Sequence, residues 1–264
     1  MAIQSVRLIP RNLQFPTARF LTEAEQKRYE ELCRSFRKKA RNTLNVPQNG
    51  SNLFKVLLLN QHGIRTATLP ELDLIAEIAP DFLTGFYEDT FAVVLRSAGD
   101  SYEPNDSLAK SLAELIKKRS FSHAYIIEGL IPKEDASSAY GLSFEKGERF
   151  KVIKAPAFDN KNNGRKFTRI NPDYTVDFDN DGKRIFYTRN SGVSWLYLSR
   201  GLGAYSGCRD LADSNGSGRV VCIADEVGAN FSEVYESQLR QEAEKKKAEI
   251  DVQFTKAMAV LQGK

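Results

Sequence analysis

The chain has 264 residues, of which 41% are apolar, so it can bury enough surface to fold into one large or two small domains. Thirty-eight basic against thirty-four acidic residues leave a net charge of +4, which is too small and too mixed to mark a nucleic-acid or membrane-surface protein. The three cysteines, Cys33, Cys208 and Cys222, are too few and odd in number for a disulfide framework. Because there are also only two histidines, a metalloenzyme is not expected.

The sequence shows no signal for a membrane or for export. No run approaches eighteen apolar residues, and the N-terminus lacks a charged head followed by a long apolar stretch and a small-residue cleavage site. We therefore expect a cytoplasmic protein without a membrane span.

The first predicted element is a helix from about 22 to 44. Thr22 and Glu25 form a capping box, and apolar residues follow at helical spacing. The polar face of this helix is basic and could hold phosphates, although such a face is more often only solvated. Its basic residues are Arg34, Arg37, Lys38, Lys39 and Arg41.

A cluster of turn-forming residues over 46–52 marks a boundary after this helix. We expect residues 1–49 to form an N-terminal helical extension and residues 50–225 to form the main, ligand-binding domain. Residues 226–264 are then a C-terminal helix.

The first half of the main domain alternates strands and helices. Leu53 to Leu59 is an apolar run of strand length, and Phe91 to Leu95 reads as a buried strand. Leu69-Pro70-Glu71-Leu72 opens a helix with proline in its first turn. A second helix begins at Asn105 or Asp106 and ends in Lys117-Lys118-Arg119, where cations suit the carbonyl end of the helix dipole.

The second half of the main domain is predicted to consist mostly of short strands separated by Gly, Asn, Asp and Pro clusters. The runs are Tyr125 to Ile127, Gly141 to Phe144, Phe150 to Ile153, Phe167 to Ile170, Tyr174 to Phe178 and Ile185 to Thr188. Together with the helices they predict an α+β fold. Residues 141–150 also look like the paired-strand segment of an SH3 domain, but a strand-turn-strand unit of ten residues is common.

In the last part of the chain, after about residue 226, the spacing of apolar residues is helical again. Asn230 and Glu233 make another capping box, and a charged helix to about Leu261 follows with an apolar stripe. We expect this helix to pair with the N-terminal helix, within one chain or between two chains of a homo-oligomer.

Asp177, Asp179 and Asp181 are a weak candidate for a metal site. They match the first half of a calcium loop, but Thr188 stands where that loop needs a bidentate Glu. The segment also lies between two strand-like runs, so a hairpin turn at 180–182 is the favoured interpretation, and we expect no metal.

The chemistry-bearing residues do not predict an enzyme. His62 and His123 have no nearby partners that read as a catalytic triad, and surface or structural roles are the better interpretation. No glycine-rich phosphate loop is present, because the glycines near 201 to 207 precede neither a Lys-Ser/Thr pair nor a convincing helix. We therefore expect no cofactor and no enzymatic activity.

The most informative part of the sequence is residues 195–217. Seventeen of these twenty-three positions are Tyr, Trp, Ser, Gly, Arg, Asn, Asp or Cys, and the other six are Leu or Ala. No Lys or Glu occurs, although both are abundant elsewhere. This is the composition of a paratope, in which aromatic residues supply rigid contact area and small polar residues supply adaptable hydrogen bonds.

Five apolar residues interleave with these positions and could pin the segment to a core while their neighbours face outward. They are Leu196, Leu198, Leu202, Leu211 and Ala212. A genetic argument agrees, because mutating the adenines of an Asn codon gives Asn, Asp, Tyr, Ser, Gly, Arg, Cys or His but neither Lys nor Glu. Trp195 would then derive from an adenine-containing Arg codon.

The chain here resembles the variable proteins of diversity-generating retroelements, which carry a variable region in a C-type-lectin-like fold that ends in a glycine-arginine-valine-valine strand. The matching residues are Gly218-Arg219-Val220-Val221 at the exit, Ser191-Gly192-Val193 at the entry and Leu69-Pro70-Glu71-Leu72 at a helix start. The resemblance covers about 191–221 well and the rest of 50–225 loosely. The family's variable region usually sits at the extreme C-terminus, whereas this chain continues for about forty residues.

The resemblance implies a non-enzymatic protein whose hypervariable surface binds a macromolecular ligand, protein rather than nucleic acid. The implied ligand-binding residues are Trp195, Tyr197, Ser199, Arg200, Gly201, Gly203, Tyr205, Gly207, Cys208, Arg209, Asp210, Asp213 and Asn215. Among them we expect Trp195, Tyr197 and Tyr205 to be exposed anchors. Two alternatives stay open: a nucleic-acid-binding protein using its basic helices, and a structural phage or virion component.

Overall fold

The computed structural model describes residues 5–7, 17–46, 50–214 and 216–224. The chain divides after Ala224 into two compact units, and every feature below belongs to the first unit. The predicted C-terminal helix, with its expected pairing, lies outside the described residues.

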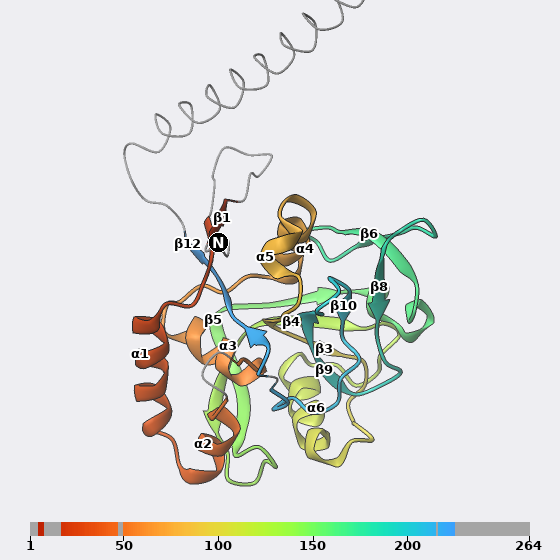
Figure 1. The fold of residues 1–264 in the computed structure, drawn as a ribbon. Coiled ribbons are helices and arrows are strands. Elements are labelled where there is room, and N and C mark those ends of the chain that lie inside the picture. Colours follow the sequence, from red (N-terminus) through yellow and green to blue (C-terminus); the bar gives the residue numbers. More distant parts are fainter. Residues whose placement is uncertain (1–4, 8–16, 47–49, 215, 225–264) are drawn as a thin grey trace, which may run out of the picture. The chain divides into compact units, whose positions relative to one another are not determined.

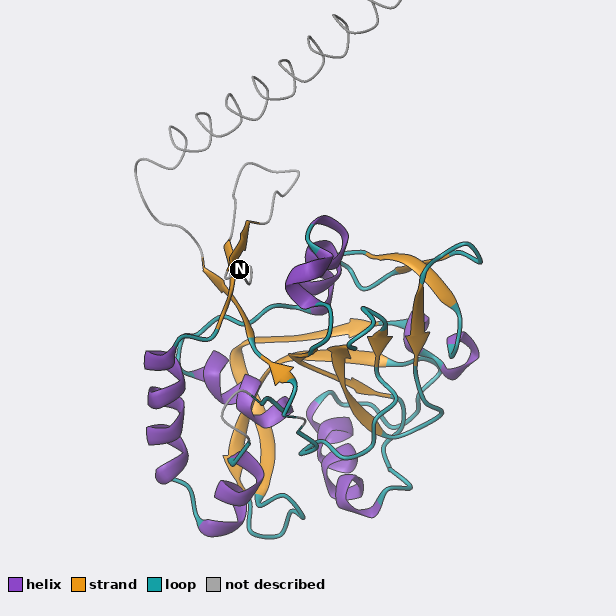
Figure 2. Ribbon diagram, viewed as in Figure 1, coloured by secondary structure: helices purple, strands orange, loops and turns teal. Residues whose placement is uncertain are grey.

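The described residues form the expected α+β fold, built on a large and mostly antiparallel sheet (Figures 1 and 2). Its strand order is β5-β4-β3-β9-β10-β8-β6-β7, with β11 beside β3. The strands are β3 (Tyr87–Leu95), β4 (Tyr125–Glu134), β5 (Leu142–Lys154), β6 (Lys166–Ile170), β7 (Val176–Phe178), β8 (Arg184–Tyr187), β9 (Val193–Leu198), β10 (Ala204–Tyr205) and β11 (Gly218–Arg219). The β10–β8 and β11–β3 pairs are parallel.

A second, three-stranded sheet joins the start and the end of the unit. It has the order β1-β2-β12, with β1 (Ser5–Arg7), β2 (Thr17–Phe20) and β12 (Val221–Ala224). β12 runs antiparallel to β2, with Val221 opposite Phe20. The predicted exit strand 218–221 is therefore real, but it is shared between β11 in the large sheet and β12 in the small one.

The helices are α1 (Glu23–Arg34), α2 (Lys38–Leu44), α3 (Leu53–Gln61), α4 (Leu69–Ile78), α5 (Pro80–Leu83) and α6 (Glu103–Leu115), with 3-10 turns at Pro156–Phe158 and Asn160–Asn162. They line two cores, one on each face of the large sheet. Because side chains alternate along a strand, Val93 enters the core shared with α1, α2, α3 and α6, whereas Val94 enters the core shared with α4 and α5.

Two of the predicted helix starts are confirmed, the first with its predicted capping box and the second with a capping box that was not predicted from the sequence. Thr22 with Glu25 caps α1, and Thr68 with Glu71 caps α4, which opens with Leu69-Pro70. α6 begins earlier than predicted, at Glu103, with Pro104 in its first turn, and Lys117 to Arg119 follow the helix rather than end it.

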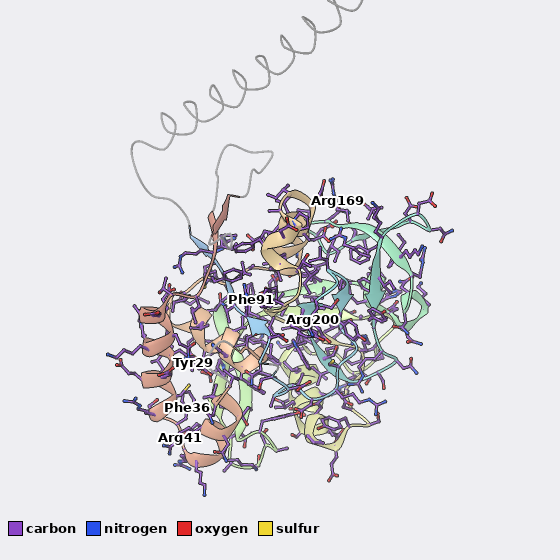
Figure 3. The ribbon with its side chains drawn as sticks, in the orientation of Figure 1. Tyr29, Phe36, Arg41, Phe91, Arg169 and Arg200 are labelled. Atoms are coloured by element: carbon purple, nitrogen blue, oxygen red, sulfur yellow. The ribbon has the colours of Figure 1, made fainter. Side chains whose placement is uncertain are left out.

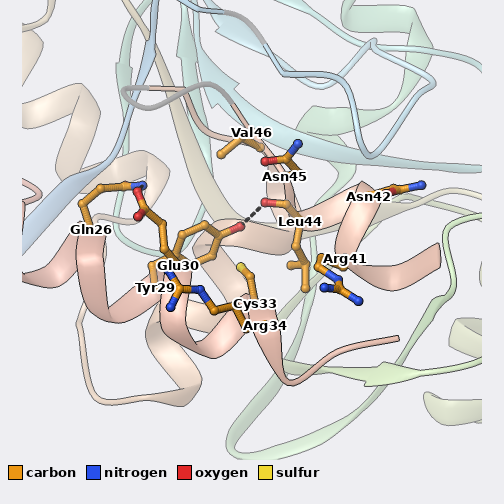
Figure 4. A pocket seen from close by; sticks show the side chains of 10 residues that line it. All are labelled: Gln26, Tyr29, Glu30, Cys33, Arg34, Arg41, Asn42, Leu44, Asn45 and Val46. Carbon is orange, nitrogen blue, oxygen red and sulfur yellow. Dashed lines mark hydrogen bonds between the residues drawn. The ribbon is translucent and has the colours of Figure 1, made fainter. Parts of the chain in front are cut away.

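The single helix predicted over 22–44 is wrong, because it is broken between Arg34 and Lys38. The Arg37 backbone N–H, freed at the break, donates to the Glu134 carboxylate on β4. The Tyr29 hydroxyl donates to the Leu44 carbonyl, which folds α2 back against α1 (Figure 4). Tertiary contacts thus override a helical pattern that contains no proline or glycine.

The strand predicted at Leu53 to Leu59 is also wrong, since these residues form α3. A run that is apolar on every side fits a buried helix as well as a buried strand. The Asn52 side chain favours the helix over the strand, because it caps the first turn by accepting a hydrogen bond from the Lys55 backbone N–H. All seven residues 53–59 are buried.

Residues 17–44 are not an extension of the main domain. β2 pairs with β12, and Tyr29, Cys33, Ala40 and Leu44 belong to the same core as Val93. The expected boundary at residue 50 therefore does not separate two packed units, which fits the clustering of Met1–Ala224 as one.

Two smaller strand predictions need correction. Residues 141–150 do not form a strand-turn-strand unit, because the chain from Leu142 onward belongs to one long strand, β5, that pairs with β4. The turn at 180–182 exists, with Gly182 N–H donating to the Asp179 carbonyl, but β6 lies between β7 and β8, so the turn closes no hairpin. Within the described part of the chain, no helix is long and apolar enough to cross a membrane.

Candidate functional site

Residues 195–217, called the display segment from here on, begin in the middle of the large sheet. β9 lies between β3 and β10, and the chain then turns through 199–203 into β10. From Ser206 the chain crosses the α6 side of the sheet, where the buried Leu211 enters the core, and it reaches β11 beside β3. The display segment thus contains most of β9, a turn and β10. It then continues as the returning loop, residues 206–217, which crosses the side of the large sheet that faces α6.

Three of the five apolar residues expected to pin the segment are buried as predicted, whereas Leu202 and Ala212 are only half-buried. Leu196 and Leu198 point from β9 into the α4 core, and Leu211 is 0% exposed in the α6 core. These residues fix the path of the segment, since a fully buried leucine contributes about 2 to 3 kcal/mol relative to an exposed one.

Trp195 and Tyr197 are not exposed anchors, which corrects the expectation from sequence. They are only 3% and 6% exposed, on the face of β9 opposite the leucines, and they belong to the α6 core. The Tyr197 hydroxyl lies 3.0 Å from the Cys208 Sγ in the returning loop. The side chains of β9 do alternate between the two faces of the sheet, as expected. Both faces of this central strand are covered, however, so neither set of side chains is exposed.

Four aromatic rings stack in a row from the interior to the surface. Trp195 stacks on Tyr197 at 5.4 Å between ring centroids, Tyr197 on Tyr205 at 5.1 Å, and Tyr205 on Tyr187 at 4.3 Å. The two inner rings are buried, whereas Tyr205 and Tyr187 are half-buried. Only the outer pair can contact a ligand, and Tyr187 of β8 lies outside the display segment.

The inner end of this row meets a buried carboxylate. The Trp195 indole N–H donates to Asp89 Oδ1 at 2.8 Å, and the Ser51 hydroxyl donates to Asp89 Oδ2. Burial raises the pKa of Asp89 to about 6, although both hydrogen bonds favour its ionised form. The neighbouring Glu88 is also fully buried, and burial raises its pKa well above the usual range.

Nine of the thirteen predicted residues are accessible. They are Ser199, Arg200, Gly201, Tyr205, Gly207, Cys208, Arg209, Asp210 and Asp213. Arg200, labelled in Figure 3, is exposed, and its Nε–H donates to the Gly85 carbonyl at 3.1 Å. Gly201 has open space where a Cβ would stand, so this position accommodates a side chain.

Gly203 is a structural residue rather than a display residue, which is a second correction. It is buried, and a Cβ there would lie 2.7 Å from the Ile185 carbonyl oxygen. Asn215 lies outside the described residues.

The scaffold holds the returning loop mainly by its backbone. Side chains from outside the segment donate to its carbonyl groups: Arg96 to Ser206, Asn105 to Arg209 and Asn52 to Ala212. The Leu211 N–H in turn donates to the Tyr140 hydroxyl at 3.3 Å. Since these contacts involve main-chain atoms, the side chains of Gly207 to Asp210 can change without breaking them.

Arg96 is the most heavily bonded of these scaffold residues. Its buried guanidinium donates to the Phe158 carbonyl, to the Ser194 and Thr188 hydroxyls, and to both oxygens of Ser206. Burial without a paired carboxylate lowers its pKa to about 9, so it remains charged at neutral pH. This cation joins β3, β8, β9 and the start of the returning loop.

An ion pair supports the entry to β9. Arg189 and Asp100 are 2.8 Å apart and almost fully buried, and Asp100 also accepts from the Val193 N–H. The supporting roles of Arg96, Asp100, Asn105 and Tyr140 were not predicted, because the local sequence around a single polar residue does not tell whether that residue is exposed or buried. Asn52 was placed only in a turn cluster.

The other candidate residues from the sequence are the three aspartates and the two histidines. No group of three or more His, Cys, Asp or Glu residues that could hold a metal ion occurs in the described ranges, which include Asp177, Asp179 and Asp181. His123 pairs with Asp159 at 3.2 Å, and His62 ends α3.

The basic clusters are partly engaged in the fold. Arg37 lies 3.8 Å from Glu134, and the Lys39 ammonium donates to the Ala136 carbonyl. Arg41, labelled in Figure 3, is exposed on α2. Lys118 lies over the Tyr125 ring at 5.3 Å.

Comparison with known proteins gives no identification. No family model, no curated protein and no solved structure matches this chain.

Proposed function

We propose that this chain is a non-enzymatic binding protein, in which a C-type-lectin-like scaffold presents the display segment to a macromolecular ligand, most simply a protein. On this proposal the segment is diversified by adenine-directed mutagenesis of a diversity-generating retroelement. The support is the composition of residues 195–217, the exit motif at 218–221, and the way the scaffold holds the returning loop.

The observation that carries the proposal is the backbone anchoring of residues 206–212. A surface that changes its side chains must keep its path, and the donors Asn52, Arg96 and Asn105 fix that path through carbonyl groups. Leu211 adds a buried side-chain anchor. Between the anchors, Gly207 and Arg209 can then vary in size and charge, whereas Cys208 contacts the Tyr197 hydroxyl and Asp210 accepts from the Ala212 N–H.

The proposed contact surface combines two sources. The nine accessible residues supply small polar groups, two arginines and two aspartates, and the Tyr205–Tyr187 pair supplies a rigid aromatic rim. Rigid aromatic residues and arginine are the residue types that dominate binding energy at protein interfaces. Tyr187 lies outside the display segment, so on this proposal it stays the same in every natural sequence of that segment and gives each of them the same aromatic contact.

A matched pair of triple variants tests the proposal. The display variant carries Arg200→Ser, Arg209→Ser and Asp213→Ser, and the control carries Arg119→Ser, Arg149→Ser and Asp181→Ser. All six side chains are exposed, and both variants change the net charge by the same amount. Each protein is immobilised and exposed to protein fractions from its source habitat and, separately, to generic double-stranded DNA.

We expect the wild type and the control to capture the same protein, and the display variant to lose it with an unchanged melting temperature. Equal capture by the display variant would contradict the proposal. So would salt-sensitive DNA binding by the wild type without capture of any protein, which would favour a nucleic-acid-binding protein.

A further inference from the structure

A cavity of about 750 Å³ lies where α1 faces the end of the display segment. Gln26, Glu30 and Arg34 of α1 form one wall, and Phe86 and Arg219 belong to the opposite one. We call it the α1 cavity. Its volume is in the range of small-molecule sites, and an adjoining cavity of about 540 Å³ between α1 and α2 shares the same three α1 residues (Figure 4).

Lys55 is a buried cation that lines the α1 cavity. It is 1% exposed, and its ammonium donates to the Gly50 carbonyl at 2.7 Å and to Gln26 Oε1 at 2.9 Å. Among the described residues no carboxylate lies within ion-pairing distance of this ammonium. An ammonium has three donors, and the ring of Tyr29 lies 5.1 Å from this one, so two N–H groups have oxygen acceptors and the third can serve a further acceptor in the cavity.

Arg219 is the second cation of the cavity. Its Cζ lies 3.0 Å from the centre of the Phe86 ring and 4.5 Å from that of Phe20, so the two aromatic rings hold the planar guanidinium. No acceptor in the described ranges takes a hydrogen bond from it. A guanidinium held in this way presents several N–H donors in a fixed fork, which matches the oxygens of a phosphate or a carboxylate.

The other charges of the cavity leave it basic. Lys27 and Arg34 add two cations, and Glu23 and Glu30 add two carboxylates. One Glu30 oxygen already accepts from the Gln26 amide at 2.9 Å. Four cations against two carboxylates favour an anionic occupant.

We propose that the α1 cavity binds a small molecule through a phosphate or carboxylate group, which accepts hydrogen bonds from both the Arg219 guanidinium and the Lys55 ammonium. The site is separate from the nine accessible residues of the display segment and does not rest on the function proposed for them. Among the described residues of the display segment, Gly216 alone lines the α1 cavity, where the chain continues toward β11.

Titration calorimetry of the full chain with two probes, sodium phosphate and sodium succinate, tests the proposal. Ionic strength is held constant with sodium chloride, so that general screening by salt does not change. We expect saturable binding of at least one probe. Phosphate alone identifies a phosphate ligand, succinate alone identifies a carboxylate ligand, and each result supports the site.

Arg219→Met and Lys55→Met should each weaken that binding by roughly tenfold or more, because each removes charge-assisted hydrogen bonds. Lys38→Met is the control, since Lys38 is exposed on α2 and does not line the α1 cavity. If Lys55→Met does not fold, Arg219→Met decides the question alone. Absence of saturable binding, or equal weakening in Lys38→Met, would overturn the proposal.

Discussion

Replacing Trp195 with alanine should destabilise the whole fold instead of merely removing a contact surface. The side chain is 3% exposed, stacks on Tyr197 and donates its indole N–H to Asp89. Truncating a buried tryptophan costs about 3 to 5 kcal/mol in lost packing. Losing one of the two donors to a buried carboxylate adds about 1 to 3 kcal/mol.

The expected total of about 5 kcal/mol is a large share of the 5 to 15 kcal/mol that holds a typical domain together. Urea unfolding followed by far-UV circular dichroism measures this loss, and fluorescence is unsuitable because Trp195 is the chain's only tryptophan. Trp195→Phe keeps most of the ring and should lose about half as much. Arg209→Ala, an exposed control, should stay within about 0.5 kcal/mol of the wild type.

A Trp195→Ala variant within about 1 kcal/mol of the wild type would refute this reasoning. It would mean that Trp195 is exposed in solution, and that the returning loop does not cover β9.

Three further predictions concern the support of the display segment. Leu211→Ala should lower the unfolding free energy by about 2 to 5 kcal/mol, since its side chain is fully buried; a loss below 1 kcal/mol would show that the loop is not anchored there. Arg96→Met should leave several buried acceptors unpaired and should increase protease cleavage within 204–213, whereas an unchanged cleavage pattern would contradict the role given to Arg96. Asp89 has its folded-state pKa raised to about 6, so protonation favours the folded state and the stability contributed by this group grows as the pH falls through 6. The unfolding free energy of the wild type, relative to Asp89→Asn, should therefore rise by about 2 kcal/mol from pH 7 to pH 4, and a flat difference would contradict it.

Sequence alone predicted the elements whose signals are local. The capping box of α1 depends on residues three apart, the start of α4 is marked by Leu69-Pro70, and the short strands β6, β7 and β8 follow from apolar runs between turn clusters. The α+β class follows from the same signals.

Sequence failed where distant contacts decide the outcome. The break between α1 and α2 depends on Glu134, about a hundred residues away, and the helical state of 53–59 depends on a cap that competes with an equally good strand pattern. The pairing of β2 with β12 joins segments two hundred residues apart, which no local pattern reveals.

Some features of the candidate site could likewise be predicted from the sequence, and others could not. Composition and the leucine pattern locate the display segment, and nine of the thirteen predicted residues are accessible. Burial of Trp195, Tyr197 and Gly203 could not be predicted, because the returning loop and β8 cover them from elsewhere in the sequence. Arg96 and Asn105 likewise acquire their roles only through contacts made about a hundred residues away.

Sequencing the gene and its surroundings in several individuals of the source population would show whether a retroelement diversifies the display segment. We expect a neighbouring reverse transcriptase and a near-copy of the codons for 191–221 that differs from them at adenines. We also expect variation at the accessible positions, such as Arg200, Arg209 and Asp213, with Leu211 and Arg96 constant. An unvarying segment with no template copy would contradict the proposed function and leave residues 195–217 as a constant strand and loop of an α+β domain.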